Sequence, residues 1–362
     1  MRQGDAAEAR SAWWTLAVGC GLVVSLLALG AAPASAERRD ADPLSLGPIE
    51  PRPGAGPVRD RVLEGKPRGA ARASAASGPQ AYQDQDGHTV TVRVSEAYAN
   101  PGAVAQNLVD FLGTLLHGDE MNDLTVFIAT PAEIRGQCGA GVLACYFPDA
   151  EEMVVSGDDA GPKEPPREFV IAHEYGHHVA TNRRNKPWSA LQRGTKRWST
   201  YEGICRGIKR GRIHPGNYFQ NPGEAHAEAF AFYHFRDAIP WEWRIARPDQ
   251  GSFDAIFADV MSPWTRRTSI GFSGELAGRG AREVHRIRLP LDGRLRVKLD
   301  GPPGADFDLR LLAPRRPRVL DRALSPAPDE TLFYTVCGRR GARIAVRSAH
   351  GSGRFDLTAS RP

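Results

Sequence analysis

The stretch from Phe169 to Asn182 reads FVIAHEYGHHVATN and contains an H-E-x-x-H motif that runs from His173 to His177. Apolar residues recur at helical spacing, no proline interrupts the stretch and two prolines precede it, so the sequence predicts a helix. Residues four apart share one helix face, which lets both histidines bind one Zn²⁺. Glu174 is then placed to take a proton from a water at that metal. The motif therefore predicts half of a zinc site, and the alternative is a surface helix that carries two histidines.

The residue that completes this site decides its subclass, because a catalytic zinc usually has three protein ligands and one open position. The longer motif H-E-x-x-H-x-x-G-x-x-H is absent, since Ala180 stands at its glycine position and Arg183 at its third histidine position. A second predicted helix over 223–235, GEAHAEAFAFYHF, offers Glu224 and Glu228 on one face. Glu224 as ligand makes a His₂Glu site, and Glu228 can accept the other ring N–H of a ligating histidine.

Other side chains compete for these roles. His226 is a rival ligand that projects from another face of its helix, and His178 follows the second histidine of the motif and so points away. Tyr218 precedes the second helix and either donates a hydrogen bond to the oxyanion of a tetrahedral intermediate or packs in a loop. The glutamates could also form a solvated face, but the flanking Ala and Phe residues favour a buried helix, whose carboxylates need partners.

At this point the chain resembles the gluzincin metallopeptidases, in the H-E-x-x-H helix and in the stretch Asn221–Phe230, NPGEAHAEAF. Thermolysin-like and anthrax lethal factor-like enzymes show this arrangement, the latter with a Tyr shortly before the Glu. The resemblance covers about 88–262 and implies a zincin-like fold in which peptide substrates lie along an edge strand near 152–156. By position it implies these roles: His173, His177 and Glu224 as metal ligands, Glu174 as general base, Glu228 as the hydrogen-bond acceptor of a ligating histidine and Tyr218 as oxyanion donor.

The chain also departs from that family. The segment between the two helices differs from that of thermolysin, and His234 is only a weak counterpart of its downstream catalytic histidine. Residues of a substrate pocket therefore do not transfer to this sequence.

The first 36 residues predict a secretory signal peptide, with a positively charged start, a mostly apolar stretch over 13–32 and the small-x-small cleavage site Ala34-Ser35-Ala36. An uncleaved N-terminal anchor is the alternative, although the apolar core is short for a membrane span. No other segment is long and apolar enough to cross a bilayer. We expect a secreted, extracellular protein without stable membrane insertion, or one held at the cell surface.

Four cysteines follow the signal peptide, and an even number in an exported chain favours disulfide bonds. Cys138 and Cys145 are close in sequence, so a local bridge is expected, and Cys205 with Cys337 is the remaining pair. None of the four has the C-x-x-C spacing of a zinc site. The net charge of +5 comes mostly from Arg residues spread along the chain, which argues against a nucleic-acid partner.

Composition and periodicity divide the rest of the chain. Residues 37–80 are rich in Pro, Gly, Ala and Arg without periodicity, which predicts a disordered linker or pro-segment. Residues 81–265 mix predicted strands and helices around the motif, with loop-like sequence over 183–222. Over 266–362, about seven short alternating runs separated by turns predict a β-sandwich. The expected fold is therefore α+β, a zincin-like metallopeptidase domain followed by an accessory β-sandwich.

This last domain is similar to bacterial pre-peptidase C-terminal domains, in the stretches 304–311, 329–334 and 351–357. Such domains accompany secreted peptidases and are β-sandwiches. The resemblance implies contact with a cell wall or a protein surface through this domain.

Together these patterns predict a secreted zinc metallopeptidase that hydrolyses a protein or peptide substrate, with Glu174 as general base. The alternative from another class is a non-catalytic secreted protein whose zinc is structural and whose β-sandwich does the binding. The intact Glu174 argues against it, since a structural zinc needs no base and would have four protein ligands and no open position. A third interpretation is a peptidase that cuts only its own pro-segment or one partner.

Overall fold

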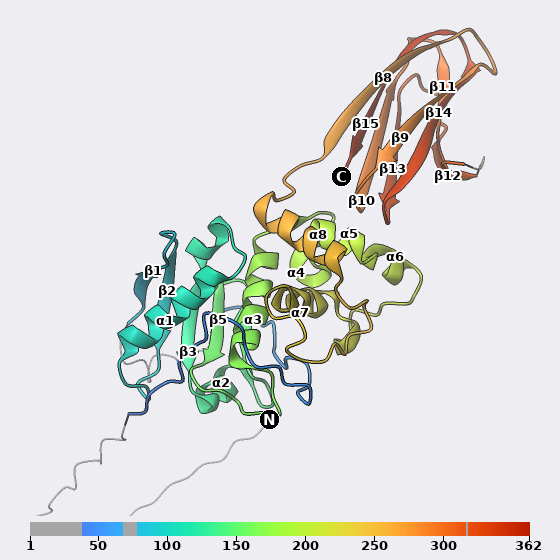
Figure 1. The fold of residues 1–362 in the computed structure, drawn as a ribbon. Helices are drawn as coiled ribbons and strands as arrows, with labels where there is room; N and C mark the ends of the chain where they lie inside the picture. Colours follow the sequence, from blue (N-terminus) through green and yellow to red (C-terminus); the bar gives the residue numbers. More distant parts are fainter. Residues whose placement is uncertain (1–37, 68–77, 316–317) are drawn as a thin grey trace, which may run out of the picture. The chain divides into compact units, whose positions relative to one another are not determined.

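The computed structural model describes residues 38–67, 78–315 and 318–362 (Figure 1). The predicted signal peptide, residues 1–36, lies outside the described residues. Helices surround a mixed sheet up to residue 261, and from residue 268 the regular elements are strands alone. The expected α+β class is confirmed at this level.

The first sheet has five strands in the order β1-β2-β3-β5-β4. β2, β3 and β5 run parallel, and β1 and β4 pair antiparallel at the two ends. Because β5 lies between β3 and β4, the edge near the H-E-x-x-H helix is β4, not the stretch 152–156 that the family resemblance implies. The strands are β1 (Gln80–Gln83), β2 (Thr89–Val94), β3 (Thr125–Ala129), β4 (Cys145–Phe147) and β5 (Glu152–Ser156).

The helix expected at 223–235 corresponds to α7. The stretch 183–222 differs from its loop-like prediction, because it holds helices of one or two turns, too short for apolar periodicity to show in the sequence. The elements are α1 (Pro101–Thr114), η2 (Asp119–Asp123), α2 (Pro131–Cys138), α3 (Arg167–Thr181), β6 (Arg184–Asn185), β7 (Trp188–Ser189), α4 (Ala190–Arg193), α5 (Lys196–Tyr201), α6 (Ile204–Lys209), η3 (Tyr218–Gln220), α7 (Pro222–His234) and α8 (Gln250–Met261).

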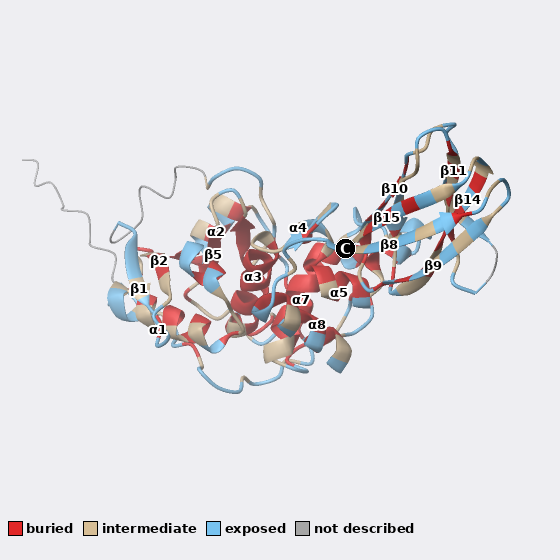
Figure 2. Cartoon of the chain, turned by 90° about the horizontal axis from the view of Figure 1, so that it is seen from above, coloured by how far each residue is buried: buried red, intermediate tan, exposed pale blue. Residues whose placement is uncertain are grey.

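Helices α3 and α7 pack directly on each other and form the centre of this domain. Both are buried along most of their length, as Figure 2 shows in red. Proline at the first turn of α7 and the Asn221 side chain, which accepts a hydrogen bond from Gly223 N, start that helix. Gly176, inside the motif, allows the close approach, because a Cβ there would lie 2.9 Å from the Ala227 Cα. This contact brings the motif and the Glu224/Glu228 face together.

Replacing Gly176 by Ala is therefore expected to lower the free energy of unfolding by about 1–3 kcal/mol, since the methyl group meets the backbone of α7. Urea denaturation measures the change. Gly136→Ala is the matched control, because Gly136 is also helical but a Cβ there meets nothing within 4 Å. We expect the control to be neutral or more stable. Equal effects of the two substitutions would show that the helix contact does not need glycine.

The segment 38–67 packs against this domain, which differs from the disorder predicted for 37–80. Leu44, Ala55 and Val58 are buried in the same hydrophobic core as α1 and α3. The segment makes its hydrogen bonds mainly to the domain and forms no regular helix or strand of its own. Its apolar residues therefore follow no helical or strand period. Composition alone predicts disorder here because the segment has few apolar residues. Composition cannot show that each of these residues is buried at a separate site on another element.

Part of this segment extends the sheet beyond β4. Leu143 N donates to Arg59 O at 2.7 Å, Tyr146 N donates to Arg61 O at 3.0 Å, and Leu63 N donates to Tyr146 O at 2.9 Å. The bridge between residues 62 and 146 is parallel. Residues 59–63, which we call the edge segment, therefore occupy the edge that β4 would otherwise expose.

Residues 268–361 form two four-stranded antiparallel sheets, ordered β13-β10-β15-β8 and β12-β11-β14-β9. Both sheets contribute to one buried cluster that includes Val297, Leu309, Ile344 and Phe355, so they form a β-sandwich. It has one strand more than the seven predicted, because β12 is short and has no buried residue. The strands are β8 (Thr268–Leu276), β9 (Arg282–Leu289), β10 (Gly293–Asp300), β11 (Asp306–Leu312), β12 (Val319–Ala323), β13 (Glu330–Val336), β14 (Arg340–His350) and β15 (Gly353–Arg361).

Both predicted disulfide bonds are confirmed. Cys138 at the end of α2 is bonded to Cys145 in β4, and Cys205 in α6 is bonded to Cys337 just after β13. In the described part of the chain, we find no helix with the length and apolar character needed to span a membrane.

Candidate metal centre

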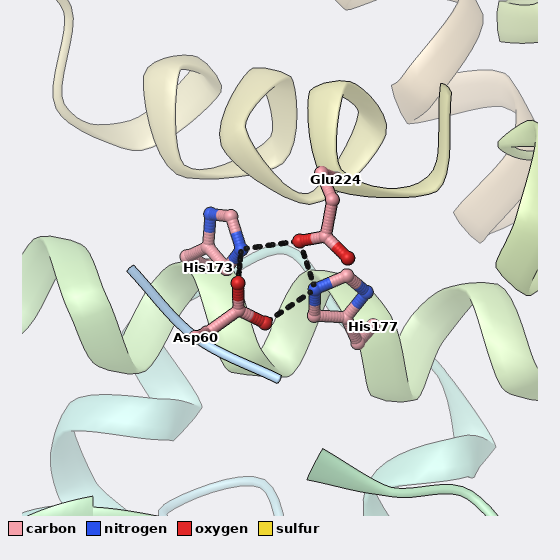
Figure 3. Close-up of side chains that lie close together, drawn as sticks. All are labelled: Asp60, His173, His177 and Glu224. Atoms are coloured by element: carbon pink, nitrogen blue, oxygen red, sulfur yellow. Dashed lines mark ion pairs between the residues drawn. The ribbon is translucent and has the colours of Figure 1, made fainter. Parts of the chain in front are cut away.

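Four side chains converge between α3, α7 and the edge segment (Figure 3). His173 and His177 come from one face of α3, Glu224 from the first turn of α7, and Asp60 from the edge segment. All four residues are buried. The structure thus brings together the three ligands predicted from the sequence and adds a fourth candidate that the sequence did not suggest.

The distances between the ligand atoms fit a single metal ion. His177 Nε2 lies 3.2 Å from Asp60 Oδ2 and 3.3 Å from Glu224 Oε2. His173 Nε2 lies 3.6 Å from Glu224 Oε2 and 3.8 Å from Asp60 Oδ1. A tetrahedral ion with bonds of about 2.0–2.2 Å holds its ligand atoms about 3.3–3.6 Å apart. These four distances lie within a few tenths of an ångström of that range, with a different oxygen of Asp60 facing each histidine.

Unpartnered polar atoms give a second, independent sign of a cation site. His173 Nε2, His177 Nε2, Glu224 Oε2 and Asp60 Oδ2 are all buried, and none has a hydrogen-bond partner. Buried polar atoms are nearly always hydrogen-bonded, because leaving them unpaired costs free energy. Four such atoms that face one point are satisfied together by a metal ion with nitrogen and oxygen ligands.

The charges of the cluster also favour a cation. Burial by itself would lower the pKa of both histidines, but the carboxylates of Glu224 and Asp60 outweigh it and raise the pKa of His177 to about 10. The pKa of His173 is raised well above its usual value by Asp60, Glu224 and Glu228, again against burial. Without a metal the site therefore holds protons, and a divalent cation replaces them.

Glu174 lies beside this cluster without taking part in it. Both of its carboxylate oxygens are buried and have no hydrogen-bond partner. Burial first, and then the charge of Asp60, raise the pKa of Glu174 well above its usual value. A carboxylate that is fully buried, unpaired and next to the candidate ligands is suited to accept a proton there.

Glu228 holds one of the ligands in place. Its Oε2 lies 2.9 Å from His173 Nδ1, so that ring nitrogen donates to the carboxylate and the other nitrogen faces the cluster. Glu228 is four residues after Glu224 on α7, and the spacing seen in the sequence accounts for both positions.

Replacing Glu228 by Ala is expected to weaken metal binding by about 10–100-fold, because His173 loses the partner that orients its ring. Glu228→Gln retains an oxygen acceptor and should lie between the wild type and the alanine variant. Competition with a chromophoric chelator measures the affinity. An unchanged affinity in the alanine variant would show that packing alone orients His173.

Tyr218 reaches the site, but its hydroxyl is engaged by the edge segment. The hydroxyl donates a hydrogen bond to Val58 O and also lies 3.2 Å from Asp60 Oδ1. Burial raises the pKa of Tyr218, so the hydroxyl stays protonated and able to donate. Its role toward an oxyanion stays a prediction.

The rival histidines make other contacts. His226 Nε2 pairs with the Thr195 hydroxyl at 3.1 Å, and burial lowers the pKa of His226 to about 3. His178 sits between the Tyr146 hydroxyl and a backbone carbonyl. His234 Nε2 accepts from the backbone N–H of residue 116 at 3.1 Å. None of the three belongs to the metal cluster.

Asp60 is the functional candidate that sequence reasoning missed. It lies in the run Val58-Arg59-Asp60-Arg61, where an acid between arginines resembles any solvated linker. Only the pairing of this run with β4 brings the carboxylate to α3.

A second group, Asp84, His88 and His117, also has ligand atoms close enough for a metal ion. Asp84 Oδ1 accepts from the backbone N–H groups of Asp86 and His88, and its Oδ2 lies 3.1 Å from His88 Nδ1. The three residues carry no buried side-chain atom that lacks a partner. This group is satisfied without a cation, so the argument for a metal applies to the first cluster.

Comparison with known proteins does not assign the chain to a family. No family model and no curated protein matches the sequence. Among solved structures, a pre-peptidase C-terminal domain of a collagenase from Bacillus anthracis is 12% identical with a TM-score of 0.23, over 26% of this chain and 89% of that one. The lysozyme inhibitor PliG from Aeromonas hydrophila is 12% identical with a TM-score of 0.22, over 26% and 86%. IMPa from Pseudomonas aeruginosa, solved with an O-glycopeptide, is 12% identical with a TM-score of 0.17, over 66% and 37%. These scores are too low to support an argument about fold or function.

Proposed function

We propose that the protein is a secreted zinc-dependent peptidase of the gluzincin type, with His173, His177 and Glu224 as metal ligands. The observation that carries the proposal is Glu174, whose buried carboxylate has no hydrogen-bond partner and lies beside the ligand cluster. A purely structural metal site has no use for such a base. Two imidazoles and a carboxylate are the ligand set of catalytic zinc in peptidases, which supports zinc as the metal.

The residues divide the chemistry as follows. A zinc ion bound in the cluster supplies Lewis acidity, which polarises a peptide carbonyl and acidifies a water. Glu174 accepts the proton of that water and passes it to the leaving amine. Tyr218 donates a hydrogen bond to the developing oxyanion once Val58 O and Asp60 Oδ1, which its hydroxyl now contacts, have moved away. Glu228 keeps the ring of His173 in its ligating orientation.

The remaining features support the same proposal. Helices α3 and α7 with the mixed sheet are the arrangement expected of a zincin-like domain, and the edge of β4 would bind a peptide as an added strand in place of the edge segment that now pairs with it. The two disulfide bonds suit an oxidising, extracellular setting. We assign the β-sandwich an accessory role in contact with a cell wall or protein surface.

One observation favours the non-catalytic alternative. With Asp60 the cluster offers four protein ligands, which is the number found in closed, structural zinc sites. In that case the zinc would hold the edge segment on the domain, and the β-sandwich would carry the function.

The deciding experiment measures zinc content and peptide-library cleavage for the Asp60→Ala variant, in which the fourth ligand is gone. The proposal expects one zinc per chain and cleavage that a chelator abolishes and added zinc restores. A variant that binds zinc but cleaves no peptide in the library would favour the non-catalytic alternative. A variant and wild type that both lack zinc would reject the metal centre itself.

A further inference from the structure

We propose that the edge segment is a built-in inhibitor of the metal centre, and that Asp60 is an exchangeable fourth ligand which closes the site. This inference concerns the regulation of the site and rests on the proposed function for the statement that the open site cleaves peptides. It requires only that Asp60 leave the metal for a water or substrate to approach, with no covalent step.

Asp60 occupies the two positions that a peptide carbonyl would need. Its Oδ2 lies among the candidate ligand atoms, 3.2 Å from His177 Nε2, and its Oδ1 lies 3.2 Å from the Tyr218 hydroxyl. The side chain has no exposed surface. One carboxylate thus spans the metal position and the candidate oxyanion donor, as a bound substrate or product carboxylate would.

The backbone around Asp60 occupies the substrate edge as well. Three hydrogen bonds link residues 59–63 to Leu143 and to Tyr146 of β4. The backbone groups that this edge strand would otherwise offer to a peptide are therefore already paired. A peptide that binds by adding a strand competes for the same groups. The edge segment therefore blocks the metal and the peptide-binding edge together.

The edge segment is anchored differently from the other ligands. His173, His177 and Glu224 stand on two helices packed in the core, whereas Asp60 stands on a strand added to a sheet edge. Besides its three backbone hydrogen bonds to residues 143 and 146, exposed contacts hold it: Arg59 pairs with Glu164, and just beyond it Gly65 N donates to Asp149 Oδ2 at 2.8 Å. The exposed contacts contribute little each, and the backbone bonds lie at the sheet edge, so the strand can be displaced without unfolding the helices.

The neighbours of Asp60 speak against a permanently closed structural site. Glu174 keeps a buried carboxylate without any hydrogen-bond partner next to the candidate ligands. A site built only to hold the edge segment would not need this carboxylate. It has a use as a base once Asp60 has left.

The test compares the full chain with Asp60→Ala and Asp60→Asn, and uses Glu64→Ala as the matched control. Glu64 is an exposed acid beside the edge segment. Each protein is loaded with Co²⁺, and its visible absorption spectrum is recorded during titration with acetohydroxamate, a small bidentate metal ligand. Zinc-loaded samples are assayed on the peptide library in parallel. Asp60→Asn keeps the size of the side chain and an acceptor for Tyr218 but loses the charge, so it remains informative if the alanine variant folds poorly.

We expect acetohydroxamate to change the Co²⁺ spectrum of both Asp60 variants and to leave those of the wild type and Glu64→Ala unchanged. Peptide cleavage should rise by about 10–100-fold in the Asp60 variants, because a tethered carboxylate competes at an effective concentration of about millimolar. If the Asp60 variants bind acetohydroxamate but cleave no peptide, the result would support the proposal that Asp60 closes the site and would contradict the proposed peptidase activity. If the wild type binds acetohydroxamate as readily as the variants, the result would contradict the proposal that Asp60 closes the site, while the proposed peptidase activity would stand. Loss of bound metal from both folded Asp60 variants would also overturn it, since Asp60 would then be an indispensable ligand.

Discussion

In the Asp60→Ala background, replacement of Glu174 by Gln is expected to lower peptide cleavage by about 10²–10⁴-fold while one zinc ion per chain is retained. Glutamine has nearly the size and shape of glutamate but cannot accept a proton from a water. Glu174 is not among the ligand atoms of the cluster, so its replacement removes no metal bond. Loss of turnover without loss of metal is the result that separates a general base from a ligand.

We also expect a defined effect of Glu174→Gln on stability. The Glu174 carboxylate is fully buried and makes no hydrogen bond, so its amide counterpart breaks none. Removing an unpaired buried acid from beside the candidate ligands should leave the melting temperature unchanged or higher. Differential scanning calorimetry and metal analysis on the same sample provide both measurements.

Glu96→Gln is the control for this experiment, because Glu96 is an exposed glutamate and should keep full activity. Cleavage by the Glu174→Gln variant at the rate of its parent would contradict the mechanism. Loss of zinc in that variant would instead place Glu174 among the metal ligands.

The second large effect is expected at Glu224. Replacement by Ala removes one of the three ligands held on the core helices. It should weaken zinc binding more than Glu228→Ala does, for which we expect a loss of about 10–100-fold because Glu228 acts through His173. Zinc that binds only the folded protein stabilises it, by about 2.7 kcal/mol when its concentration is 100 times the dissociation constant. The wild type should therefore melt at a higher temperature with zinc than after chelation, and Glu224→Ala should lose most of that difference.

His226→Ala is the contrasting variant for this prediction. His226 lies on the same helix but pairs with Thr195 and contacts the ring of Trp198, so its loss should affect packing and leave the zinc stoichiometry unchanged. Unchanged zinc affinity in Glu224→Ala, or loss of zinc in His226→Ala, would move the third ligand to another residue.

Much of the candidate site follows from spacing along two helices. His173 and His177 share a face of α3 because they are four residues apart, and Glu224 and Glu228 share a face of α7 for the same reason. Local patterns of this kind can be predicted because a helix converts sequence spacing into direction without reference to the rest of the fold. The alternation that predicted the β-sandwich and the count that predicted two disulfide bonds are equally local.

What local patterns could not supply depends on which segments meet. The sequence by itself determined the H-E-x-x-H face, the paired acids and the strand-rich C-terminal region. Only the tertiary structure decided that β4 is the edge of the sheet, that residues 59–63 pair with it, and that Asp60 lies at the metal centre. The physical reason is that an extended segment rich in Pro and Arg has no period of its own. Its conformation is set by the backbone hydrogen bonds and separate pockets that another part of the chain offers, and those exist only once α3, α7 and the sheet have packed.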